Sequence, residues 1–155
     1  MIDWPIAEPS PVQKLHALSQ ALPGCVVVER DYPVSVDALW DRLCDLPRTV
    51  PQIQSHVRRL EVLGSSGEHL DLRVDGYLGV RTSMRAVLEP QWCVMQSRFL
   101  VIGMAVDATA NGARLARLQS VRISGVPIPR FAIRRNLLAE LRRLAHLTER
   151  PPAVG

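Results

Sequence analysis

Three arginines stand in segments that otherwise alternate between apolar and polar residues, and their charge makes them the first candidates for chemistry. Arg30, Arg98 and Arg117 each share one face of a predicted strand with apolar neighbours. A buried charge is costly unless it is paired, so an arginine facing a cavity would mark a docking point for a carboxylate or phenolate. Alternatively, each arginine lies on the solvated face or reaches water at a strand end. Arg30 is the first candidate, because neither its strand nor the helix that follows requires an arginine there.

Methionines are the second group of candidates. Met84, Met95 and Met104 fall in successive segments of period two, together with Phe99. Flexible thioethers suit a pocket for varied apolar ligands, and they are also ordinary core residues. Trp40 can likewise be a core residue or a residue that stacks on a ligand, and its position in a predicted helix favours the core.

The sequence carries no motif typical of a cofactor site, a metal site or nucleophilic catalysis. The glycines lack the spacing of a phosphate-binding loop, and no nucleophile elbow is present. The four histidines are scattered over four segments, so a zinc site is not expected. The three cysteines, Cys25, Cys44 and Cys93, are odd in number and far apart, which speaks against a disulfide framework. We therefore expect no cofactor and no metal, and catalytic residues cannot be named.

Composition indicates one globular domain with a sizeable core. The chain has 155 residues, of which 47% are hydrophobic and 22% charged. No apolar run approaches the roughly 20 residues of a membrane-spanning helix, and the N-terminus lacks the pattern of a secretory signal. These features predict a cytoplasmic protein without a membrane span.

The net charge of +4 is concentrated near the C-terminus. From Val126 onward there are six arginines against Glu140 and Glu149, and Lys14 is the only lysine of the chain. This preference for arginine can reflect phosphate recognition or the codon usage of a GC-rich genome.

The candidate residues depend on a strand that changes abruptly into a helix. The segment 26–32 alternates as a strand does, and Pro33 ends it. Ser35 is placed to cap a helix and Asp37 lies in its first turn. Apolar residues then recur at helical spacing, and Pro47 and Pro51 leave room for only one more short turn or helix.

Six further strands and a long helix follow. Residues 56–123 have period two with turn signals between the strands, among them Asp75–Gly76 and Asn111–Gly112, and a division near Gly103. The final amphipathic helix, about 17 residues long, would span about 25 Å. Its outward side would carry Arg135, Arg142 and Arg143.

The two ends of the chain are predicted to lie outside the main domain. Residues 1–24 form a predicted helical extension that starts at Ser10–Pro11 and stops at Pro23–Gly24. This extension can close a cavity mouth, pair with a second subunit to form a homodimer, or pack outside. We expect one domain over residues 25–149 and a disordered tail over residues 150–155.

This order of elements resembles the helix-grip fold of the START-like (SRPBCC) superfamily, which includes polyketide cyclase/dehydrase-like proteins. The segments "YPVSVDALWDRLCDL" and "IPRFAIRRNLLAELRRLAHL" carry the likeness, which covers roughly residues 26–147. The turn Val34–Ser35 replaces the frequent Ala–Pro of the family. The expected fold is α+β: a seven-stranded curved antiparallel sheet wrapped around the long C-terminal helix, in the order β-α-α-β6-α, with an extra N-terminal helix.

The resemblance implies an internal cavity between sheet and helix that holds an apolar or amphipathic small molecule. One face of the strands and the inner stripe of the last helix would line it. The candidate ligand-binding residues are Arg30, Tyr32, Thr82, Met84, Met95, Arg98, Phe99, Met104, Leu137 and Leu141.

Three functions follow as hypotheses. The first is a binding protein for a lipid- or polyketide-like ligand. The second is an enzyme of the polyketide cyclase/aromatase kind, in which Arg30, Thr82 and Arg98 would act on a reactive polyketone. The third is an interaction protein whose arginine-rich last helix contacts an acidic surface such as RNA, the ribosome or a membrane. Of these surfaces, nucleic acid is not the expected partner.

Overall fold

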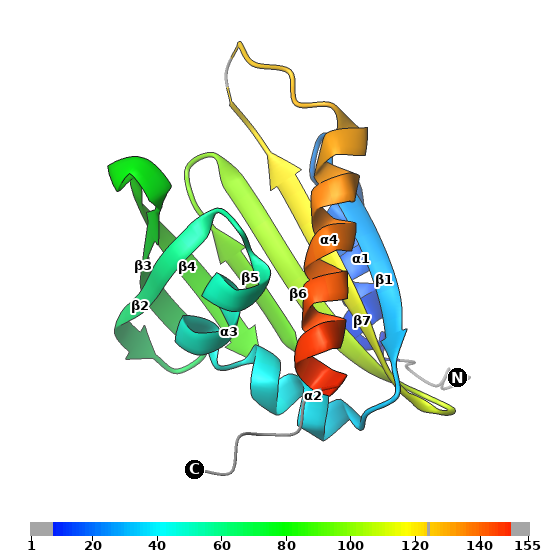
Figure 1. The fold of residues 1–155 in the computed structure, drawn as a ribbon. Helices are drawn as coiled ribbons and strands as arrows, with labels where there is room; N and C mark the ends of the chain where they lie inside the picture. The colour runs from blue at the N-terminus through cyan, green and yellow to red at the C-terminus, as the bar shows by residue number, and fades with distance from the viewer. Residues whose placement is uncertain (1–7, 124, 150–155) are drawn as a thin grey trace, which may run out of the picture.

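The computed structural model describes residues 8–123 and 125–149, and its centre is a seven-stranded antiparallel sheet (Figure 1). The strands lie side by side in the order β1-β7-β6-β5-β4-β3-β2. Their bounds are β1 (Val26–Tyr32), β2 (Val57–Ser66), β3 (His69–Gly76), β4 (Arg81–Glu89), β5 (Trp92–Gln96), β6 (Leu100–Thr109) and β7 (Gly112–Val121). The predicted α+β class and the order of the elements are confirmed. The expected tail over residues 150–155 lies outside the described residues.

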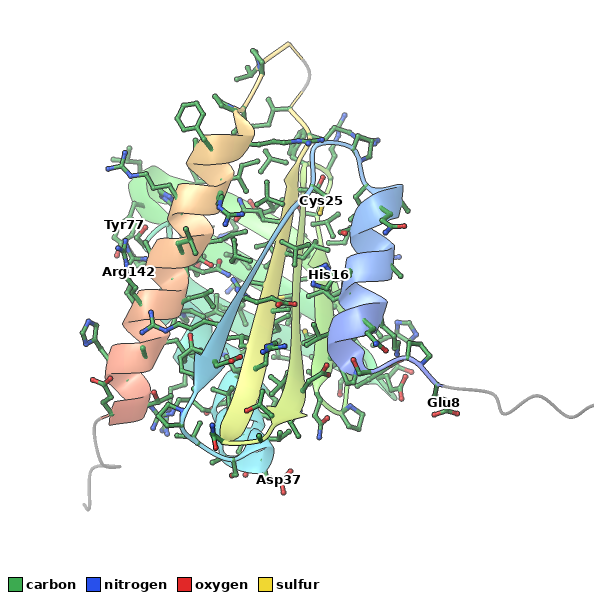
Figure 2. All side chains as sticks on the ribbon, turned by 90° about the vertical axis from the view of Figure 1, so that its right-hand side faces the viewer. Glu8, His16, Cys25, Asp37, Tyr77 and Arg142 are labelled. Atoms are coloured by element: carbon green, nitrogen blue, oxygen red, sulfur yellow. The ribbon has the colours of Figure 1, made fainter. Side chains whose placement is uncertain are left out.

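Helices cover both faces of the sheet. The helices α2 (Val36–Leu43), α3 (Leu46–Ile53) and α4 (Arg130–Glu149) lie on one side, here termed the inner face. The N-terminal helix α1 (Pro11–Ala21) lies on the opposite, outer face, and Figure 2 shows α4 and α1 on either side of the sheet. Each face has its own cluster of buried apolar side chains.

The junction between β1 and α2 has the predicted geometry. The hydroxyl of Ser35 accepts a hydrogen bond from the backbone N–H of Ala38 at 3.1 Å, which caps α2. Asp37 lies in the first turn, where the helix dipole favours negative charge. Leu39 and Leu43 are buried on the side that faces the sheet. The chain therefore changes from strand to helix across Pro33–Ser35, as the sequence predicts.

The helix α3 is the short helix that the sequence allows, and α4 is longer than the 17 or so residues expected. Pro47 lies in the first turn of α3, where proline is tolerated, and Pro51 lies within this helix, which is stabilised by tertiary burial. The 20 residues of α4 cross the inner face. One of its arginines was predicted wrongly: Arg143 does not face solvent but is half-buried and donates to the Ile53 carbonyl at 2.8 Å, which ties α4 to α3.

The prediction of a strand boundary near Gly103 is wrong. The turn between β5 and β6 lies at residues 97–99, and Gly103 is an interior residue of β6. A Cβ atom at this position would lie 2.7 Å from Cδ1 of Leu15 in α1. Glycine is therefore required here for close approach between helix and sheet rather than for a turn.

The N-terminal helix is fastened to the outer face at both ends. At its start, the hydroxyl of Ser10 donates to Asp107 of β6 at 2.6 Å, and the backbone N–H of Val12 donates to the same carboxylate at 3.1 Å. Beyond its end, the hydroxyl of Ser120 in β7 donates to the Pro23 carbonyl at 3.0 Å. Of the three roles considered for this extension, the described part packs outside the sheet.

Candidate functional site

The inner face brings six of the ten candidate residues together. They come from β1, β4, β5, β6 and α4, each is buried, and all belong to one cluster between the sheet and its helices. These residues are Tyr32, Met84, Met95, Met104, Leu137 and Leu141. Strand alternation and the helical stripe therefore point to the same interior.

The other four candidates lie at or beyond the rim. Arg30 has the inward register that its neighbours indicate, yet it is exposed, because β1 is an edge strand and the long side chain reaches past the edge. Its guanidinium lies 5.7 Å from the centre of the Tyr32 ring. Thr82 is half-buried, and Arg98 and Phe99 are exposed in the turn between β5 and β6 rather than in a strand. The structure does not bring Arg30 or Arg98 into the interior.

A different arginine is buried there. Arg117 of β7 is only 1% exposed, and its guanidinium donates to the carboxylate of Glu140 in α4 at 2.8 Å. The side-chain amide of Asn136, one turn earlier in α4, donates to the other oxygen of that carboxylate at 3.1 Å. Across the sheet, Arg117 is paired with Val28 on one side and Met104 on the other. These three polar residues form a network within an apolar interior, here termed the Arg117 network.

One donor of this network has no acceptor. The Nε atom of Arg117 is buried and lacks a hydrogen-bond partner among the described residues. A buried donor without a partner typically costs about 1–3 kcal/mol. The interior can therefore offer one N–H group, carried by a positive side chain, to an oxygen of a bound molecule.

The sequence marks Arg117 as a possible buried charge but does not place it among the ligand-binding candidates, and it does not identify Glu140 and Asn136 as its partners. Glu140 lies three residues after Leu137, and Asn136 lies four residues before Glu140, so both fall beside the buried stripe of α4. A carboxylate at such a position signals a buried counter-charge, and it could have identified the pair before the structure did.

Two other ionisable groups of the interior stay neutral at ordinary pH. Burial raises the pKa of Tyr32 to about 12, and its hydroxyl donates to the Leu141 carbonyl at 2.8 Å. Burial also raises the pKa of the Cys93 thiol to about 12. Neither group is therefore an effective base or nucleophile near neutrality.

A hollow with a volume of about 760 Å³ lies elsewhere, across β2 to β5. Its polar wall includes a row of cross-strand partners, Asp71, Arg85 and Gln96. These residues alternate along their strands with Leu72 and Met84, which are buried in the inner cluster. The row therefore faces outward, and the same hollow is also lined by Leu72, Met84 and Arg98, so two of the ten candidate residues border it.

Among the described residues, no group of three or more histidine, cysteine, aspartate or glutamate side chains is placed to hold a metal ion. None of the helices in the described part is long and apolar enough to cross a membrane.

Comparisons with known proteins identify the fold. No protein-family model and no curated protein sequence matches the chain. A crystal structure of a Mesorhizobium loti protein matches with a TM-score of 0.63 at 15% identity, covering 81% of this chain and 96% of that one. The Zhui aromatase/cyclase of a Streptomyces species matches with a TM-score of 0.61 at 15% identity, covering 84% of this chain and 98% of that one.

The chain has the helix-grip fold. A third similar structure is that of DynU16, a putative protein in the dynemicin biosynthetic locus, with a TM-score of 0.63 at 23% identity, covering 81% of this chain and 47% of that one. In this helix-grip protein, a buried apolar cluster lies between the inner face and α4, at the place where the sequence resemblance implies a cavity. The Arg117 network lies at the same place.

Proposed function

We propose that this helix-grip protein binds an apolar or amphipathic small molecule between the inner face of the sheet and α4, and that Arg117 contacts the polar end of the ligand. The observation that carries this proposal is the buried Nε of Arg117, which has no partner in the described residues. An arginine whose Nη2 group already donates to Glu140 can still donate its Nε–H to a carbonyl, phenolate or sulfonate oxygen of a ligand.

The apolar part of the ligand would take the place of flexible side chains. Met84, Met95 and Met104 belong to the same buried apolar cluster as Leu137 and Leu141 of α4. Methionine has three rotatable side-chain bonds and adapts to irregular shapes, so these residues can repack around a ligand. Binding would thus require movement in the interior, which favours ligands that provide a large apolar surface.

Two fluorescent probes test this proposal. The anionic probe 1-anilinonaphthalene-8-sulfonate should bind the folded protein saturably at one site, and so should the uncharged probe N-phenyl-1-naphthylamine. In the double variant Arg117→Met/Glu140→Met both charges are replaced by unbranched apolar chains. Loss of a hydrogen bond to a charged group should weaken binding of the anionic probe roughly tenfold or more. Binding of the uncharged probe should change little.

The variant Arg98→Met is the matched control, because it removes an exposed arginine outside the interior. It should bind both probes as the wild type does. Absence of saturable binding by either probe would contradict an interior ligand site. Unchanged affinity of the double variant for the anionic probe would show that Arg117 is not the polar contact. Near-ultraviolet circular dichroism should confirm that each variant remains packed.

A further inference from the structure

The loops at one end of the molecule expose most of its large apolar side chains. Because the sheet is antiparallel, the connections after α1, α3, β3, β5 and β7 all meet at the same end, uppermost in Figure 1. We term the described residues of these five connections the loop end. Of eleven exposed large apolar side chains in the described part of the chain, eight lie there or in the adjoining first turn of α4.

The connection between β3 and β4 is the clearest case. Tyr77, Leu78 and Val80 are all more than half exposed, and the Leu78 side chain is fully exposed at 102%. Leu78 also has a positive φ of 64°, a conformation that is uncommon for a leucine. Its side chain makes no contribution to the core that would offset this backbone conformation. Such a residue at a loop tip is a candidate for contact with something outside the molecule.

The neighbouring connections repeat the pattern. Phe99 is exposed between β5 and β6, and Ile123, Val126 and Ile128 are exposed between β7 and α4. Phe131, in the first turn of α4, is 73% exposed. These side chains come from three separate connections and project from tips, so they do not form one flat patch or a groove.

Positive charge surrounds these apolar tips. Among the described residues of these connections and of the strand ends that border them, Asp75 is the only acidic one, and it pairs with Arg81 at 3.1 Å. Six exposed arginines lie in the loop end, in the adjoining first residues of β2 and β4, or at the start of α4: Arg58, Arg81, Arg98, Arg122, Arg130 and Arg134. The opposite end presents acidic side chains, among them Glu8 and Asp37 in Figure 2. The loop end is therefore both apolar at its tips and basic around them.

We propose that the loop end docks on the surface of an anionic lipid bilayer, with the tips in the interfacial layer and the arginines on the headgroups. Interfacial binding requires apolar side chains that enter the bilayer and basic side chains around them that contact the headgroups. A bilayer accommodates separate protruding tips, whereas a protein partner would need a pocket for each one. Five of the eight apolar side chains are aliphatic and cannot stack on bases, which argues against RNA. This inference does not depend on the proposed ligand site.

Co-sedimentation with vesicles tests the inference on the full chain. The protein should bind vesicles of mixed phosphatidylglycerol and phosphatidylcholine, bind pure phosphatidylcholine weakly, and lose affinity as salt is raised. Each arginine near an anionic surface contributes about fivefold to affinity, so Arg122→Gln/Arg130→Gln should weaken binding about 25-fold. Leu78→Ser/Phe131→Ser should weaken it at least about tenfold, because two apolar side chains no longer enter the interface.

The control is the double variant Leu63→Ser/Arg142→Gln. It changes an exposed leucine of β2 and an exposed arginine in the middle of α4. It should bind vesicles as the wild type does. No binding to anionic vesicles at low salt would overturn the inference, and so would an equal loss in the control variant. Binding to RNA that competes with vesicles and is insensitive to Leu78→Ser/Phe131→Ser would assign the surface to nucleic acid instead. All test substitutions are at exposed positions, so folding should be retained.

Discussion

Arg117 carries a positive charge into a space that is otherwise lined by apolar side chains, and Glu140 offsets its desolvation. The two side chains are 2% and 5% exposed and 2.8 Å apart. A buried ion pair of this kind is seldom a net source of stability, because the cost of removing both charges from water is comparable to their attraction. On this argument the pair adds little net stability, in keeping with the proposed ligand contact.

The cost of the pair can be measured by removing one or both charges. Arg117→Met alone should lower the free energy of unfolding by about 3–5 kcal/mol, because Glu140 is left buried without a counter-charge. The double variant Arg117→Met/Glu140→Met should recover most of this loss or exceed the wild type. Urea denaturation followed by circular dichroism gives both values. A double variant as unstable as the single one would show that the pair stabilises the fold.

Tyr32 should make stability sensitive to alkaline pH. The pKa of the folded phenol is raised to about 12 by burial, whereas an unfolded tyrosine ionises at about 10. The neutral phenol therefore stabilises the folded state fully below about pH 10, and this contribution is lost as the pH rises through 12. Near neutral pH, Tyr32→Phe should cost about 1 kcal/mol through the lost hydrogen bond to the Leu141 carbonyl.

Above about pH 10, the free energy of unfolding of the wild type should fall more steeply than that of Tyr32→Phe, by up to about 1.4 kcal/mol per pH unit. The Cys93 thiol, with its pKa also raised to about 12, adds a loss of the same sign to both proteins. Tyr77→Phe, at an exposed site, is the matched control and should follow the wild-type profile. Parallel profiles for wild type and Tyr32→Phe would contradict this assignment.

At the scale of elements, the contact between α1 and β6 depends on the missing side chain of Gly103. Leu15 is fully buried and fills the space above this glycine, and the side chains of Val94 and Leu118 close it on either side. The helix can therefore lie close to the strands only where β6 has no Cβ. Beyond α1, none of the described helices covers the outer face, and polar residues of that face line the hollow of about 760 Å³.

Gly103→Val should displace α1 and lower the free energy of unfolding by about 1–3 kcal/mol, because the new side chain overlaps Leu15. Adding Leu15→Ala should make the cost of Gly103→Val smaller, which a double-mutant cycle measures. Gly64→Val is the control, since no atom lies within 4 Å of a Cβ at that position. Additive effects of the two substitutions would argue against direct contact between Leu15 and residue 103.

At the scale of the whole molecule, the fold was largely predictable and the site only in part. Strand alternation and the cap at Ser35 are local signals, so the order of elements and the inward register of Met84 and Met104 follow from them. Arg30 lies at the rim rather than in the interior, because alternation sets its face but its place on an edge strand sets its exposure. The partnership of Arg117 with Glu140 joins residues 23 positions apart. Sequence spacing alone does not specify which residue of α4 lies over β7.

The arrangement of the termini determines how the protein can be handled. Glu8 and the last turn of α4 both lie at the end opposite the loop end. The described chain therefore begins and ends on the side of the molecule away from the apolar tips. On a sensor chip, coupling through a cysteine introduced at Glu8 should present the loop end to the solution, whereas coupling through a cysteine introduced near Leu78 should bury it against the chip.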